Sequence, residues 1–190
     1  MEEKIIHVKN KILLALIAVG LIIAAAFLIG RKNKGISDLM LTKSDLDRLN
    51  LVEAFSFDGK ACQIEEQESI SSSSLQYAIC NYTVKDLGET WVVVELKKFS
   101  SKEDLYNNYE YESQHLFSVQ GLISENEIGD KSRFRVSNEN DFGGQYNEPG
   151  IYYYHLWVCK DDYLIHVTSR GSEKARDRVL EIGRTILSKA

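Results

Sequence analysis

The feature that most restricts what this chain can fold into is an apolar segment near its N-terminus. Residues 12–30 contain no charged and no strongly polar side chain. As a helix rising about 1.5 Å per residue, they span about 28 Å, close to the hydrocarbon thickness of a bilayer. A helix that is apolar on every side belongs in a membrane or in a large protein core, and the rest of the chain is too small to provide that core. The segment therefore predicts a single-pass transmembrane helix.

The transmembrane segment divides the chain into four parts. Residues 1–11 form a short tail, 12–30 the membrane helix, 31–41 a polar connector and 42–190 one α+β globular domain. A cleaved signal peptide is the alternative for such a segment, but its apolar region is usually only about 7–15 residues long. Apolar residues also continue past the small residues Ala24 to Ala26. We therefore predict an uncleaved signal-anchor.

The orientation of this helix is not decided by its flanking charges. Three lysines precede the helix, and three Lys or Arg residues follow it closely, so the positive-inside rule gives a near tie. Three cysteines, a glycosylation sequon at Asn81 and an acidic domain favour an extracytoplasmic domain. We therefore predict a location in the cell membrane, with the domain outside the cytoplasm.

The net charge of the domain limits the classes of molecule that it can be expected to bind. Residues 1–35 hold six of the 23 basic residues and two of the 28 acidic ones, so residues 36–190 carry a net charge of −9. Nucleic acid is a poor partner for such a domain, because it too is negatively charged. The expected partners are the membrane and another protein.

Residue periodicity predicts an α+β domain. Its expected order is helix, three strands, helix, three strands, helix, over about 42–50, 60–66, 76–84, 91–99, 101–117, 131–137, 151–160, 163–169 and 172–188. Most links are shorter than the dozen residues that a parallel crossover needs. We therefore predict a two-layer sandwich, in which an antiparallel sheet of about six strands carries its helices on one face. Only the link through helix 101–117 is long enough to carry the chain across the sheet.

The clearest local signal is a hairpin of residues 151–160 and 163–169 that turns at Asp161 and Asp162. Because side chains alternate along a strand, one face of the hairpin is apolar and should form the core. The other face holds Tyr153, His155, Trp157, His166 and Thr168. Exposed Tyr and Trp favour protein interfaces, so these five residues are the candidate partner-binding face. A semi-polar outer face without a partner is the simpler alternative.

His155 and His166 also raise a metal-site hypothesis, since both lie on the same face of the hairpin. A tight transition-metal site needs a third or fourth ligand, and the sequence offers none. We therefore expect no metal and no cofactor, and keep a metal-binding domain as an outside alternative. Motifs such as GxSxG, HExxH or a phosphate-binding glycine loop do not occur, so the sequence does not predict an enzyme.

The cysteines, Cys62, Cys80 and Cys159, match neither a zinc ribbon nor a redox CxxC motif. Cys62 and Cys80 fall on strands that are expected to be neighbours, so they are the first candidates for a disulfide. Three buried thiols are the alternative. Within the apolar segment, Gly20 and Ala24 form a small-xxx-small pair, which lets membrane helices pack closely.

The order of these motifs supports a resemblance. It consists of Leu41-Thr-Lys-Ser-Asp-Leu46, a hairpin, a helix, Ile128-Gly-Asp130, the aromatic hairpin and an amphipathic C-terminal helix. This pattern resembles prokaryotic, and mostly archaeal, membrane-anchored proteins of unknown function with a PsbP/Mog1-like α+β domain. The resemblance implies a non-catalytic binding or accessory module and carries over no functional residues. Unlike lipoprotein members, the chain has no lipobox cysteine.

Together these features predict a membrane-anchored, non-catalytic binding or accessory domain. The alternative is a small accessory subunit of a larger membrane complex, held there by its anchor helix. In that case Gly20 and Ala24 would matter more than the hairpin.

Overall fold

The computed structural model describes residues 34–55, 59–68, 74–85, 90–115, 121–137 and 148–190. The chain divides into two compact units, Met1–Lys34 and Gly35–Ala190. The predicted transmembrane segment, residues 12–30 with Gly20 and Ala24, lies outside the described residues. Within the part that is described, no helix is both long enough and apolar enough to cross a bilayer.

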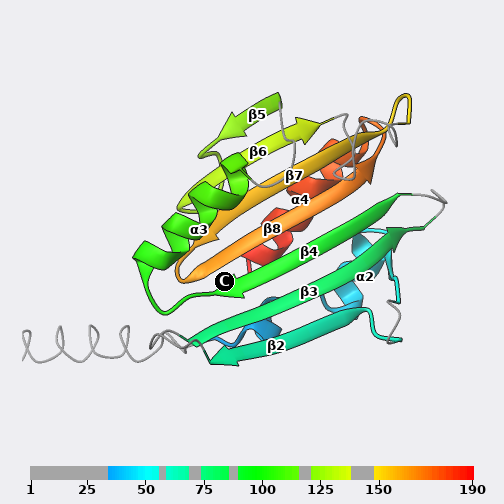
Figure 1. The fold of residues 1–190 in the computed structure, drawn as a ribbon. Coiled ribbons are helices and arrows are strands. Elements are labelled where there is room, and N and C mark those ends of the chain that lie inside the picture. Colours follow the sequence, from blue (N-terminus) through cyan, green and yellow to red (C-terminus); the bar gives the residue numbers. More distant parts are fainter. Residues whose placement is uncertain (1–33, 56–58, 69–73, 86–89, 116–120, 138–147) are drawn as a thin grey trace, which may run out of the picture. The chain divides into compact units, whose positions relative to one another are not determined.

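The second unit is a mixed α+β domain (Figure 1). Its elements are η1 (Ile36–Leu39), α2 (Lys43–Arg48), β1 (Leu51–Glu53), β2 (Cys62–Glu68), β3 (Ser74–Val84), β4 (Trp91–Lys98), α3 (Lys102–His115), β5 (Gly121–Glu125), β6 (Lys131–Ser137), β7 (Tyr152–Lys160), β8 (Tyr163–Gly171) and α4 (Ala175–Leu187).

Eight strands form one sheet, and every pair described is antiparallel. The order is β1-β3-β4-β8-β7-β6-β5, and β2 pairs with the same edge of β3 as β1 does. The antiparallel prediction is confirmed, but the sheet has eight strands rather than about six. The two strands that the sequence did not reveal, β1 and β5, have only three and five residues. The register of β5 also shifts between Leu122 and Ser124, which breaks its alternation.

The chain crosses the sheet through α3, as the link lengths predict. Strand β4 pairs with β8, whereas β5 lies at the far edge beside β6. Between them, α3 passes over the sheet (Figure 1). Its start is fixed by Ser101, whose hydroxyl accepts the N–H of Asp104 at 3.0 Å. This pair caps the helix.

The main core lies between the sheet and α4, η1 and α2. Helix α4 buries an apolar stripe there, which consists of Ala175, Val179, Ile182 and Ile186. The helix begins at Ala175 with Lys174, rather than Ser172, as its N-cap. Ser172 contributes its carbonyl instead, which accepts the N–H of Ala175 at 2.8 Å.

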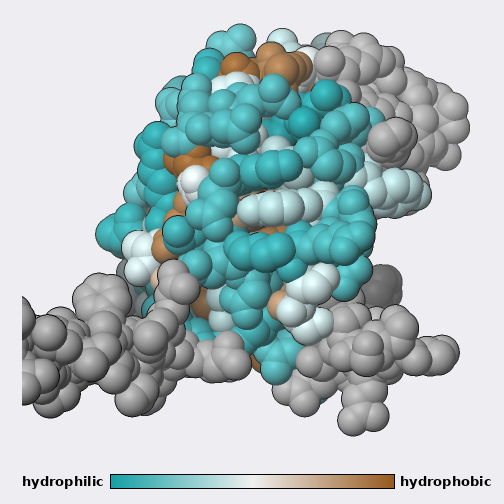
Figure 2. All heavy atoms as spheres, turned by 90° about the vertical axis from the view of Figure 1, so that its left-hand side faces the viewer, coloured by the Kyte–Doolittle hydropathy of each residue, from teal (hydrophilic) through white to brown (hydrophobic). Residues whose placement is uncertain are grey.

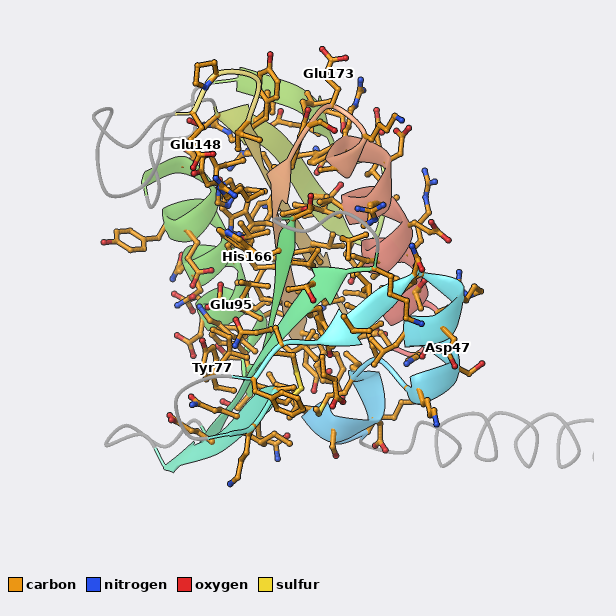
Figure 3. All side chains as sticks on the ribbon, turned by 90° about the vertical axis from the view of Figure 1, so that its right-hand side faces the viewer. Asp47, Tyr77, Glu95, Glu148, His166 and Glu173 are labelled. Carbon is orange, nitrogen blue, oxygen red and sulfur yellow. A yellow bond between two sulfur atoms is a disulfide. The ribbon has the colours of Figure 1, made fainter. Side chains whose placement is uncertain are left out.

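The expectation that all helices lie on one face is also wrong. Helix α3 packs on the opposite face, where Leu105 and Tyr109 join a second buried cluster with Trp157 and Leu164. Figure 3 shows α3 on one side of the sheet and α4 with α2 on the other. The physical reason is that β7 and β8 are buried on both faces, and a central strand of this kind needs cover on both sides.

The Gly129-Asp130 pair fastens the β7–β8 turn. The Asp130 carboxylate accepts the backbone N–H of Asp161 at 2.9 Å and lies 3.2 Å from Nζ of Lys160. Its own N–H donates to the carbonyl of Cys159 at 2.7 Å. Asp161 has a φ of +51°, so its backbone is in the left-handed region. The hydrogen bond from its N–H to Asp130 stabilises this conformation.

Only glycine fits at position 129. Its φ is +68°, and an added Cβ would lie 2.5 Å from Cγ1 of Val158 and 2.6 Å from the carbonyl oxygen of Cys159. We expect Gly129→Ala to lower the free energy of unfolding by about 2–4 kcal/mol, because backbone strain adds to overpacking. Gly150→Ala is the matched control, since Gly150 has a φ of +78° with no atom within 4 Å of an added Cβ. Denaturant titrations of both variants compare the two losses, and equal losses would contradict the close approach at Gly129.

Candidate functional site

The α3-facing side of the sheet carries a row of polar and aromatic side chains. In the registers of β4, β8 and β7, Glu95 pairs with His166, and His166 pairs with Trp157. The hairpin pairing of His155 with Thr168 follows the expected register. Figure 3 shows Tyr77, Glu95 and His166 on the same side of the sheet as α3. Four strands thus bring these residues together from distant parts of the chain.

The row is joined by hydrogen bonds. The Tyr77 hydroxyl donates to Oε1 of Glu95 at 2.9 Å, and Oε2 of Glu95 lies 2.6 Å from Nδ1 of His166. On the other side of its ring, Nε2 of His166 lies 3.0 Å from Oγ1 of Thr168 and 3.2 Å from Nδ1 of His155. A continuous chain therefore runs from Tyr77 to His155.

When His166 is neutral, the carboxylate of Glu95 fixes its tautomer. A carboxylate accepts only, so Nδ1 of His166 carries the proton and Nε2 is left as an acceptor. The donors available to that nitrogen are the Thr168 hydroxyl and Nδ1–H of His155. The direction of donation is thus defined on both sides of Glu95, whereas among His166, Thr168 and His155 it depends on the tautomer of His155.

The five residues of the candidate partner-binding face are buried, so the expectation that their side chains are exposed is wrong. Their exposed fractions are 7% or less, in the set Tyr153, His155, Trp157, His166 and Thr168. The Trp157 ring stacks on His166 with centroids 4.6 Å apart, and on His155 at 5.3 Å. The alternation of the strands was predicted correctly, but α3 covers the Trp157 end of this face.

Burial and hydrogen bonds shift two pKa values in this network. Burial alone would raise the pKa of Glu95, but the hydrogen bond and charge of His166, with Lys97 and Tyr77, lower it to about 2. Burial, and then the neighbouring His166, holds the pKa of His155 well below its ordinary value. Glu95 is therefore ionised and His155 neutral near pH 7.

Glu95 and Tyr77 are the members of this network that sequence reasoning missed. Glu95 interrupts a run of apolar residues in Trp91-Val-Val-Val-Glu-Leu, where a carboxylate needs a partner when it is buried. That isolated acid was the available signal. Tyr77 carried no signal, because a tyrosine in a strand is ordinary.

The chemistry open to this network is limited by access. Glu95, His166 and Thr168 follow the order carboxylate, imidazole, hydroxyl, as in hydrolase triads. However, Thr168 is 7% exposed and its hydroxyl also lies 3.3 Å from His155. Within the described part of the chain, no group of three or more His, Cys, Asp or Glu side chains converges on a metal-binding point. The metal hypothesis therefore still has two ligands, a ring nitrogen each from His155 and His166.

Helix α3 is held over the face mainly by charged groups. Glu110 lies 3.2 Å from Arg133 and 3.4 Å from Lys131 on β6, and Glu112 pairs with Lys97 on β4. Lys131 also lies over the ring of Tyr106, 4.6 Å from its centroid. The apolar part of this interface is the small second cluster described above, far smaller than the main core.

A disulfide joins Cys62 on β2 to Cys80 on β3, the pair nominated from the sequence. The two residues face each other in the strand register, with Cα atoms 4.1 Å apart. Cys159 is free and fully buried under α3, where burial raises the pKa of its thiol to about 12.

Two hollows open to solvent outside the buried network. One, of about 450 Å³, is mostly apolar and lined by Ala54, Phe55, Asn81, Tyr82, Trp91, Val92 and Val93. Asn81, the predicted glycosylation site, is a half-buried residue of β3 whose N–H donates to Ala61 at 2.8 Å. Phe55 beside it is 70% exposed. Glycosylation of Asn81 stays a prediction.

The second hollow, of about 570 Å³, lies between the start of α4 and strands β5 to β7. Its lining includes the apolar residues Ile123 and Tyr154 and both acids and bases, such as Glu173 and Arg176.

Figure 2 shows a largely hydrophilic surface on the left-hand side of Figure 1, with apolar residues only in separate places. The described residues on that side therefore form no broad apolar face for docking.

Comparisons with known proteins return no relative. No protein-family profile matches the chain, no curated protein matches its sequence, and no solved structure matches its fold.

Proposed function

We propose that this chain is a single-pass membrane protein whose extracytoplasmic α+β domain is a non-catalytic binding module. The apolar segment 12–30 is the proposed anchor. The observation that carries the proposal is the Cys62–Cys80 disulfide in the domain that follows this segment. Disulfides persist in oxidising compartments and are rare in the cytosol, so the bridge favours an external domain.

The proposed binding surface is the apolar hollow around Phe55 and Trp91, rather than the buried face of the hairpin. The side chain of Phe55 is 70% exposed beside an apolar hollow. Its contact with water is unfavourable, and an apolar side chain of a partner can replace that contact. Burial, and then the charge of Glu53, raises the pKa of Tyr82 in the hollow to about 12, and the domain has a net charge of −9. The occupant we propose is therefore a protein segment that carries an apolar side chain flanked by basic residues.

Cysteine labelling of intact cells tests both parts of the proposal. Phe55→Cys places a thiol at the hollow, and Tyr111→Cys is the matched control, because Tyr111 is another exposed aromatic residue, 57% exposed, on α3. With a membrane-impermeant maleimide, we expect Tyr111→Cys to react in intact cells. We expect Phe55→Cys to react at least about fivefold more slowly in cells than in purified protein, as a bound partner excludes reagent there.

Three outcomes would contradict the proposal. Reaction of Tyr111→Cys only after lysis would place the domain in the cytoplasm. Equal rates for Phe55→Cys in cells and in purified protein would remove the partner from the hollow. Protection at position 55 that disappears after glycosidase treatment would assign the cover to a glycan on Asn81, instead of a protein.

A further inference from the structure

We propose that α3 is an acid-released cover: when the pH falls, α3 leaves the sheet while the sheet and α4 stay folded, and the face that holds Trp157 and Cys159 becomes accessible. The proposal concerns the two layers on either side of β7 and β8. It is independent of the partner proposed for the hollow at Phe55.

The two layers differ in how they are held. The α4 side is a continuous apolar core to which Val179, Ile182 and Ile186 contribute side chains with no exposed surface. On the α3 side, the described part of the helix contributes Leu105 and Tyr109 as buried apolar residues, with Tyr106 partly buried. The other contacts described there include a hydrogen bond from Arg133 to Ser113, together with ion pairs and cation–π contacts, which are individually weak. Helix α3 is therefore the layer that separates first.

The acid-sensitive group beneath α3 is the histidine pair. His155 and His166 have ring nitrogens 3.2 Å apart, and both rings stack on Trp157, which belongs to the cluster that α3 covers. A proton added to His155 places a charge against another imidazole in a site only 1% exposed. The added charge is relieved when the ring reaches water.

The groups around the pair compensate such a charge only in part. The titratable and charged residues on this face of the sheet, within the described chain, are Tyr77 on β3, Glu95 and Lys97 on β4, Lys131, Arg133 and Arg135 on β6, Tyr153 and Cys159 on β7, Arg170 on β8, and Tyr109, Glu110 and Glu112 on α3. Each of the three carboxylates is already engaged: Glu95 with His166, Glu110 with Arg133 and Glu112 with Lys97. A new proton on His155 is opposed by burial and by His166 and favoured by Glu95, and the opposing effects prevail.

The direction of the pH effect follows from the two forms. In the closed form the pKa of His155 is well below 6.5, whereas in the open form it returns toward that ordinary value. Below pH 6.5 the open form takes up a proton that the closed form does not, so the closed form loses stability as the pH falls. One proton shifts the ratio of open to closed form by up to about tenfold per pH unit, or about 30-fold in all between pH 7.5 and 5.0. The pKa of Glu95 is about 2, so its protonation adds nothing at pH 5.

Cys159 provides the readout, because it is the only free cysteine of the three and is fully buried beneath α3. The full-length protein in detergent is treated with 4,4′-dithiodipyridine, a thiol reagent that works in acid. The rate is divided by that of the urea-unfolded chain at the same pH. We expect this relative rate to rise at least about tenfold from pH 7.5 to 5.0. The amides of α4 should stay protected from hydrogen exchange throughout.

Two variants separate the role of the acid-sensitive group, His155, from that of the ion pairs that hold α3 on the sheet. His155→Gln keeps a neutral polar group of similar reach, and should flatten the pH dependence. Glu112→Gln removes one ion pair of α3, and should raise the relative rate at every pH with the slope unchanged. The proposal is overturned if the wild-type rate is the same at pH 7.5 and 5.0, or if α4 loses its protection together with α3. It is also overturned if a folded His155→Gln variant keeps the wild-type slope.

Discussion

Trp157→Ala is expected to lower the free energy of unfolding by about 3–5 kcal/mol, the range for removing a large aromatic side chain from a core. Trp157 has no exposed surface and is the largest fully buried side chain in the described chain. Its ring stacks on both imidazoles, so truncation opens a cavity and also removes the apolar surface against which the two histidines pack. Guanidinium denaturation followed by far-UV circular dichroism measures the loss without relying on tryptophan fluorescence.

Two variants control for this result. Trp157→Phe keeps a stacking ring and should recover more than half of the loss. Trp91→Ala removes the other tryptophan, which is only half-buried and contacts Tyr153 at a centroid distance of 6.4 Å. We expect the Trp91→Ala loss to be clearly smaller. Similar losses at Trp157 and Trp91 would mean that the second cluster contributes little to stability, and that α3 is not a packed layer.

Replacing Cys62 and Cys80 together by alanine is expected to lower the free energy of unfolding by about 3 kcal/mol, since the bridge closes a loop of moderate length. The bridged residues are 18 apart in the sequence. The effect should be concentrated at β2, because its described partner is β3 alone. Hydrogen exchange should therefore accelerate at β2 more than at β7 and β8, which have neighbours on both edges.

The matched control for the disulfide is Cys159→Ala, which leaves the bridge intact. Adding a phosphine reductant should destabilise the wild type and Cys159→Ala by the same amount, and leave the double variant unchanged. A wild type that reductant does not affect would show that the purified protein holds three thiols. That result would also remove the main support for an external domain.

The parts of the fold that sequence reasoning predicted correctly are those with a local signal. The helix predicted from about residue 42 begins with a capping box of Thr42 and Asp45, in which Thr42 N–H donates to Asp45 at 2.9 Å. The hairpin register at Asp161 followed from alternation, because a shift of one residue would have reversed both faces. Signals of this kind depend only on neighbouring residues.

The parts that were missed depend on long-range arrangement. The placement of α3 on the second face could not be derived, because a strand face with Trp157 and His166 fits both an exposed surface and a covered one. Strands β1 and β5 are too short to show a period. Glu95 gained its role only from pairing with His166, 71 residues later in the chain. In the candidate network, the hairpin residues were therefore predicted from the sequence, and the residues on β3 and β4 were not.

The position of Cys159 has a consequence for how the chain matures. Three cysteines allow three different bridges, and an odd thiol can attack a finished disulfide and exchange with it. In an exported domain, as proposed above, a chain made from its N-terminus meets the oxidising environment with Cys62 and Cys80 before Cys159 has been synthesised. Once α3 packs over β7, the sulfur of Cys159 is buried and the raised pKa of its thiol suppresses the thiolate. Order of synthesis and burial would then both favour the native bridge and limit later disulfide exchange.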